Sequence, residues 1–325
     1  MKKAVIISII LMLLGAVILA GAYAYSGFDI SKFGTDVFAT KTYIEDGDFT
    51  KIGINALDSD VELKKSADGK VTVECSESVK IRRDIVIENG VLCVRGEDGR
   101  TWLDRIGISV KAPKMTVYLP EGKYESMTVG GSTGDISVPD GFSFGRIQIV
   151  TDTGDVKIES APSIEEGLTY SYVEITTDTG DVAINGIVAG DIEIQTSTGD
   201  VAVNSVSCTG RFRQTVSTGD TAIETLTCKS FESNGSTGEI TLNNAFVSGS
   251  LSIKRSTGDV TLNNSDADEI NIVTDTGDVT GVLLSGKEFI TETNTGDVVV
   301  PRGGTGGKCI IATDTGDIVF TPANG

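Results

Sequence analysis

The sequence predicts an all-β fold, a parallel β-solenoid (β-helix) of about ten coils of about 20 residues each. The first observation is a tripeptide, Thr-Gly-Asp or once Thr-Gly-Glu, that occurs ten times; its glycines are Gly134, Gly154, Gly180, Gly199, Gly219, Gly238, Gly258, Gly277, Gly296 and Gly316. The second is their spacing, which is 19 or 20 residues except for one gap of 26 residues around an insertion at 161–171. The third is apolar alternation on both sides of each motif. A fixed period of about 20 with strand alternation is typical of stacked coils.

Each coil is predicted to run as a strand, a tight turn at Thr-Gly-Asp and a second strand. The residue six before the threonine is always apolar, and the residue directly after the acid is apolar except at Thr221. The position four before the threonine is interrupted at Gln214, Ser233 and Thr291, and the position two further on is interrupted at Gly281. Alternation in β-branched residues indicates one buried face, and stacking buries it.

The acidic residues of the motif are expected to form one column along the solenoid. In the first interpretation they belong to the turn, where Ser, Asp or Asn accepts a hydrogen bond and Gly takes a positive φ. In the alternative, calcium bridges neighbouring coils through carboxylate oxygens. The candidate calcium ligands are Asp152, Asp155, Asp178, Asp181, Asp275, Asp278, Asp314 and Asp317. No other cofactor is predicted.

The N-terminal residues predict a membrane segment. Lys2 and Lys3 precede an apolar run of nineteen residues from Ala4 to Ala22, which as a helix just spans a hydrocarbon core of about 30 Å. We therefore expect a cytoplasmic segment at 1–3, a transmembrane anchor at 4–24 and a stalk at 25–47. The chain would be a single-pass cell-membrane protein with its N-terminus inside and its C-terminal domain extracytoplasmic. A cleaved signal peptide is the alternative.

Residues 48–120 are predicted to form an irregular β cap, and residues 121–325 the solenoid repeats. Alternation continues in the first segment, and Ser59-Asp60-Val61 imitates the repeat motif, with Ile52 and Ile54 at the matching offsets. We interpret it as degenerate coils or hairpins, because an open first coil exposes unpaired strand edges.

These features together resemble a bacterial family of candidate adhesins, domain of unknown function 4097. The resemblance rests on the N-terminal apolar segment, on Val117-Tyr118-Leu119-Pro120 and on the Thr-Gly-Asp coils, and it covers about residues 45–321. It implies a β-strand-repeat protein of the cell envelope, in some relatives linked with envelope stress. It carries no catalytic or ligand-binding residues.

Composition excludes several functions. The net charge is −19, which argues against a nucleic-acid partner, and there is no histidine for a catalytic base or metal site. A uniform column of acids singles out no carboxylate pair, so a polysaccharide hydrolase or lyase is the least favoured interpretation. We predict that the chain is not an enzyme. Cys208 and Cys228, at one offset in consecutive coils, are expected to be buried thiols.

A contact surface is predicted at the C-terminal coils. Outward positions that are mostly polar in earlier coils become Ile290, Val299, Ile310 and Val319. Exposed apolar patches usually mark contacts, so we expect an envelope protein or a second copy there, in addition to the membrane contact of the N-terminal helix. The alternative is that another segment of the chain covers them. The insertion at 161–171 is a second candidate surface. The predicted function is that of a non-catalytic, membrane-anchored, adhesin-like envelope protein, with a calcium-stabilised surface module as the alternative.

Overall fold

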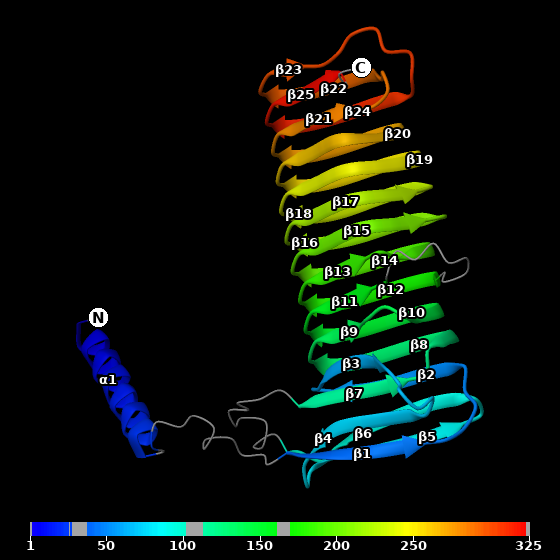
Figure 1. The fold of residues 1–325 in the computed structure, drawn as a ribbon. Helices are drawn as coiled ribbons and strands as arrows, with labels where there is room; N and C mark the ends of the chain where they lie inside the picture. The colour runs from blue at the N-terminus through cyan, green and yellow to red at the C-terminus, as the bar shows by residue number, and fades with distance from the viewer. Residues whose placement is uncertain (1, 26, 28–37, 102–112, 161–169, 323–325) are drawn as a thin grey trace.

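A computed structural model describes residues 2–25, 27, 38–101, 113–160 and 170–322. It contains one helix, α1 (Lys2–Tyr25), and is otherwise built from β-strands in the part of the chain that it describes (Figure 1). The prediction of an all-β repeat fold is confirmed. Most of the insertion at 161–171 lies outside the described residues, so its role stays a prediction.

The predicted membrane location is contradicted. A transmembrane helix needs about 20 consecutive apolar residues. Among the described residues, no helix is both long enough and apolar enough to cross a bilayer. The single-pass location, with the N-terminus inside and the C-terminal domain outside, is therefore wrong on this finding.

The motif coils consist of a strand before the Thr-Gly-Asp turn and a strand after it. The strands before the turn are β8 (Gly122–Thr133), β10 (Phe142–Thr153), β12 (Tyr170–Thr179), β14 (Val188–Thr198), β16 (Arg211–Thr218), β18 (Ser230–Thr237), β22 (Glu288–Thr295) and β24 (Lys308–Thr315). Those after it are β9 (Ile136–Val138), β11 (Val156–Glu159), β13 (Val182–Asn185), β15 (Val201–Cys208), β17 (Thr221–Cys228), β21 (Val279–Leu283), β23 (Val298–Val299) and β25 (Ile318–Pro322). Strands β19 (Ile240–Thr257) and β20 (Val260–Thr276) each run from one turn to the next and serve both coils.

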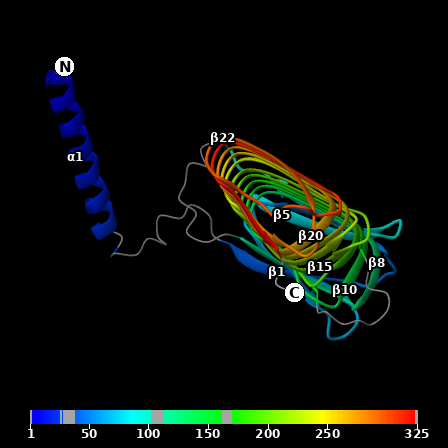
Figure 2. The same cartoon turned by 90° about the horizontal axis from the view of Figure 1, so that it is seen from above.

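The coils stack in register as parallel ladders, and Figure 2 shows them lying over one another along the axis. Ile147 pairs with Met127 on one side and Val173 on the other, all in the column six before the threonine. The alternating apolar columns are buried along most of the stack and form one continuous core. The period of the sequence therefore predicts the register, because equivalent residues meet across every layer.

A second corner separates the strand after the turn from a short third side. The corner residues share a left-handed backbone; they are Gly186, Ser205, Thr225, Asn244 and Asn264, with φ of 71°, 54°, 76°, 54° and 49°. Beyond this corner come Val206, Cys208 and their equivalents, which face inward. Each of these coils therefore has three sides.

The N-terminal end is closed by strands that leave the order of the sequence: β1 (Ala39–Glu45), β2 (Lys51–Leu57), β3 (Asp60–Lys65), β4 (Val71–Glu77), β5 (Ile81–Glu88), β6 (Val91–Asp98) and β7 (Lys114–Leu119). The first coil, β2 and β3, stacks under β8 and β9. Strands β6 and β7 lie beneath it as a parallel layer. Antiparallel β5 joins β6, and antiparallel β4 and β1 extend the ladder from β7.

At the C-terminal end, too, the spatial order of the strands differs from their order in the sequence. Strand β24 lies between β20 and β22, so that Cys309 pairs with Ile270 below and Phe289 above. Strand β25 lies between β21 and β23 in the same way. The last coil of the chain is thus the second-last layer, and the coil of β22 and β23 ends the stack (Figure 1).

Candidate functional site

Along the described layers, the Thr-Gly-Asp turns form a hydrogen-bonded edge in two runs, one from Asp60 to Glu239 and one from Asp259 to Asp297. The carboxylate of one aspartate accepts the backbone N–H of the aspartate in the next layer, as Asp155 Oδ1 does from Asp181 N at 2.8 Å. The ladder begins at Asp60, which accepts from Asp135 N, and it ends with Asp317 accepting from Asp297 N. The turn interpretation of these acids is the one the geometry supports, since each such carboxylate satisfies an amide that the turn leaves free.

Glycine is required in this column for two reasons. Gly219 has φ 144°, a backbone that other residues rarely adopt, and a Cβ there would stand 2.0 Å from the carbonyl oxygen of Gly199 in the layer below. The same close approach recurs from layer to layer. The turns therefore stack too closely for any side chain.

The calcium hypothesis stays a prediction. Asp155, Asp181, Asp278 and Asp317 belong to the ladder described above, and their Oδ1 atoms accept backbone amides. The residue before each threonine, as at Asp152 and Asp178, is exposed. Within the described ranges, no three acidic or cysteine side chains group in a way that suits a metal ion.

A buried polar cluster interrupts the apolar core in three adjacent layers. Gln214 Nε2 donates to Thr221 Oγ1 at 3.0 Å and to Ser233 Oγ at 2.9 Å. Arg255 is 1% exposed, and its guanidinium donates to Ser233 Oγ at 3.2 Å and to Thr221 Oγ1 at 3.4 Å. Gly235 makes room for it, because a Cβ there would stand 1.7 Å from Arg255 Nη1. The interruptions of the core columns at Gln214, Thr221 and Ser233 therefore belong to one site.

The charge of Arg255 is poorly compensated. Burial lowers its pKa, and the nearby charge of Asp220 acts in the opposite direction. It forms no ion pair within the described chain, and its Nε and the Oε1 of Gln214 have no hydrogen-bond partner. A buried guanidinium without an ion pair lowers the free energy of unfolding rather than raising it. The cluster lies inside the core and is closed to large ligands.

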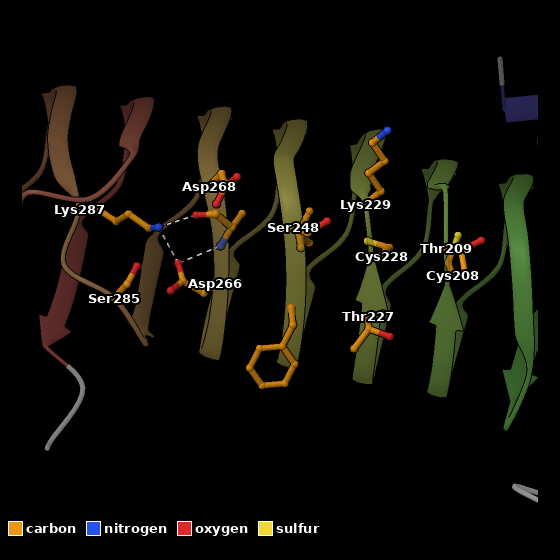
Figure 3. A pocket seen from close by; sticks show the side chains of 13 residues that line it. Cys208, Thr209, Thr227, Cys228, Lys229, Ser248, Asp266, Asp268, Ser285 and Lys287 are labelled. Atoms are coloured by element: carbon orange, nitrogen blue, oxygen red, sulfur yellow. Dashed lines mark hydrogen bonds and ion pairs between the residues drawn. The ribbon is translucent and has the colours of Figure 1, made fainter. Parts of the chain in front are cut away.

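A groove of about 620 Å³ runs along the third side (Figure 3). At one end Lys287, only 5% exposed, donates from Nζ to Asp266 Oδ1 at 2.8 Å and to the carbonyl oxygen of Ala267 at 2.5 Å. At the other end Cys208 and Cys228 lie on neighbouring strands. Both thiols are free and buried, as predicted from their spacing. Burial raises the pKa of Cys228 to about 12, so it is protonated at neutral pH.

The C-terminal end carries exposed apolar side chains that we call the terminal apolar surface: Ile290, Val298, Val299 and Ile310, exposed by 48%, 42%, 57% and 41%. Ile290 and Ile310 pair on one face, and Val299 pairs with Val319, which is half-buried, on the other. The structure thus brings the predicted contact residues together in two adjacent layers. None of the described segments covers the four exposed ones.

The buried polar cluster is marked in the sequence by a second column of residues. The position two before the threonine of the motif is itself a threonine in six of the ten layers, for example Thr177 and Thr196, which are buried and donate to glycine carbonyls. It becomes Val216, Gly235 and Arg255 in three consecutive layers. That break marks the polar cluster. Val298 was expected in the core, and it is exposed because none of the described strands lies above it.

The fold and its surfaces define an all-β solenoid of stacked repeats whose acidic turns are part of the backbone ladder. A model of the Toastrack family, domain of unknown function 4097, matches residues 49–318, and the chain belongs to this family. The family resemblance inferred from the motifs is confirmed.

Three of the solved structures that the chain matches come from Parabacteroides and Bacteroides. A candidate lipid-binding protein of Parabacteroides distasonis has a TM-score of 0.50 and 16% identity, over 75% of this chain and 97% of that one. A candidate adhesin of the same species has a TM-score of 0.49 and 12% identity, over 76% and 98%. A candidate adhesin of Bacteroides fragilis has 0.46 and 14%, over 89% and 99%. At these identities the likeness concerns the fold alone. No curated protein matches the chain.

Proposed function

We propose that this chain is a non-catalytic, adhesin-like binding protein that contacts another component of the cell envelope through its C-terminal layers. The observation that carries the proposal is the terminal apolar surface, which groups Ile290, Val298, Val299 and Ile310 at one end of a rigid stack. Apolar side chains concentrated in two layers of an otherwise acidic protein favour a contact site.

The chemistry of the other regions supports a binding role over catalysis. The column of aspartates accepts backbone amides along the stack, as Asp200 does from Asp220 N at 2.8 Å. The buried guanidinium of Arg255 lies within the core, where a polymeric substrate has no access. Lys287, in the groove, donates to a carbonyl and a carboxylate of its own chain. These groups are engaged in holding the fold.

The test measures binding of the full-length chain, coupled to fluorescent beads, to envelope preparations of the producing cells. Replacing Val299→Lys together with Ile310→Lys is expected to lower bound fluorescence at least tenfold, since charge opposes burial of the surface. Val150→Lys is the matched control, because Val150 is 42% exposed in a middle layer. Circular dichroism melts confirm that both variants fold. Equal binding by the double variant and the unmodified chain would refute the proposal.

A further inference from the structure

The last layer has an open edge on both of its strands. Strand β22 pairs with β24, and β23 pairs with β25; among the described strands neither has a neighbour on its other side. An edge of this kind presents unpaired N–H and C=O groups that template a further strand.

At this edge the last residues of the core columns are exposed to solvent. Val298 is in register with Ile318 and in the column of Val279, both of which are fully buried, whereas Val298 is largely exposed. Phe289 packs against Phe320 with tilted rings, at a ring-centroid distance of 5.4 Å, but stays half-buried, like Thr291. At the other end of the solenoid the inward residues of β4, such as Val73, are buried. One more strand over β22 would cover the exposed parts of Phe289 and Thr291.

The charged side chains of β22 indicate which side chains a further strand would need. Its outward side chains include Glu288, Ile290 and Glu292, and neither glutamate forms an ion pair within the described chain. On the edge of β22 that is already paired, the neighbouring strand β24 places Lys308 opposite Glu288 and Ile310 opposite Ile290. Opposite charges and apolar pairs facing each other across strands are stabilising. A second copy of this chain, with net charge −19, would instead bring carboxylates together.

We propose that the open edge of β22 binds an extended protein segment as an additional parallel strand, with basic side chains opposite Glu288 and Glu292 and an apolar one opposite Ile290. The segment has the pattern basic-x-apolar-x-basic, in which the intervening residues are apolar and cover Phe289 and Thr291. This inference rests on the proposed function and specifies its partner.

The probe is a fluorescent peptide containing Lys-Val-Ile-Val-Lys, titrated into the full-length chain and followed by fluorescence anisotropy. Comparison peptides replace both lysines with glutamate or the central isoleucine with proline. The lysine peptide is expected to bind at least tenfold more tightly than either, and to slow amide hydrogen exchange in β22. Equal affinity of the lysine and glutamate peptides would overturn the proposal.

Charge reversal in the protein locates the site. Glu288→Lys with Glu292→Lys is expected to weaken the lysine peptide at least tenfold. Glu269→Lys is the control, because Glu269 occupies the same offset from its turn as Glu288 but lies on β20, an interior strand. It is expected to change the affinity less than twofold. An equal loss in the control would mean general attraction to an acidic protein and would overturn the proposal.

Two further outcomes separate this proposal from its alternatives. A dimer in sedimentation velocity that Ile290→Lys abolishes, with no peptide binding, would assign the edge to a second copy. Envelope binding that is lost in Val299→Lys with Ile310→Lys but unchanged by charge reversal at Glu288 and Glu292 would overturn the strand proposal and leave the proposed function standing.

Discussion

The two ends of the solenoid are finished in different ways. At the N-terminal end, antiparallel strands β1, β4 and β5 follow the parallel layer, and a buried carboxylate, Glu77, ties β1 to β4 and β5. At the C-terminal end the stack stops after a parallel layer, with Val298 and Val299 exposed. The comparison teaches that one repeat motif produces a closed end or an open one according to what is added beyond the last coil.

The largest expected effect compares turn glycines at the two ends. Gly134→Ala places a Cβ 2.4 Å from the carbonyl oxygen of Ser59, at φ 123°, in a layer held on both sides. We expect a loss of about 3 kcal/mol or more in the free energy of unfolding. Gly296→Ala places a Cβ 2.1 Å from the carbonyl oxygen of Gly316, but its layer is held on one side only among the described strands and can move away to relieve the contact. We expect about 1 kcal/mol there. Chemical denaturation measures both, and equal losses would contradict the difference between the ends.

The second prediction concerns acid sensitivity of the closed end. Burial raises the pKa of Glu77, but hydrogen bonds from Lys41 and Tyr43, at 2.6 Å each, outweigh it, so the pKa lies below its usual value. A lowered pKa gives stability that is present above the unfolded value of about 4.3 and is lost as the pH falls through the folded pKa.

Glu77→Gln is therefore expected to cost about 2 kcal/mol at pH 7 and less at pH 3, which lies below the unfolded pKa of about 4.3, so that part of the stability given by the ionised carboxylate has been lost. Hydrogen exchange of the β1 and β4 amides at both pH values measures the effect at that end, with the β22 amides as the internal control. A cost that does not change between pH 7 and pH 3 would exclude the ionised carboxylate as its source.

The third prediction compares two buried guanidiniums. Arg83, at the closed end, donates from Nη2 to the carbonyl oxygen of Ala56 and to Ser59 Oγ, both at 2.8 Å. Arg255, in the interior, has only longer contacts. Burial lowers the pKa of both. Arg83→Met is expected to destabilise by about 2 kcal/mol, and Arg255→Met to stabilise by about 1 kcal/mol. Thermal melts with the same sign for both variants would contradict this account.

The smallest expected change in stability comes from substituting the first and the last aspartates of the ladder, Asp60 and Asp297. Asp60 Oδ1 accepts the N–H of Asp135 at 3.1 Å, whereas no layer formed by the described residues lies above Asp297. Asp60→Ala is expected to cost about 1 kcal/mol. Asp297→Ala is expected to stay within about 0.5 kcal/mol of the unmodified chain, as surface substitutions do. Urea midpoints measure both, and a cost at Asp297 as large as that at Asp60 would indicate another role for its carboxylate.

The period of the motif was enough to predict the stack, its buried columns and the role of its turns. It was not enough to predict the order of the last layers, since β22 and β24 carry the same Thr-Gly-Asp motif, and the motif alone does not say which of them pairs with β20. The second corner was also missed, because Ser205 and Thr225 carry no glycine signal for a left-handed backbone. For the candidate site, Ile290, Val299 and Ile310 were found from their break with a polar column. Val298 was not, because its exposure depends on the absence of a following layer.

The insertion of β24 between β20 and β22 has a consequence for biosynthesis. A ribosome that has released residues up to 300 has delivered β22 and β23, yet their partners β24 and β25 follow only at Lys308–Thr315 and Ile318–Pro322. The solenoid can therefore add its earlier layers as they emerge, but the layer of β22 and β23 must wait until residues 308–322 have been synthesised. The exposed edge is therefore assembled after the layers below it, although its own strands emerge before their partners.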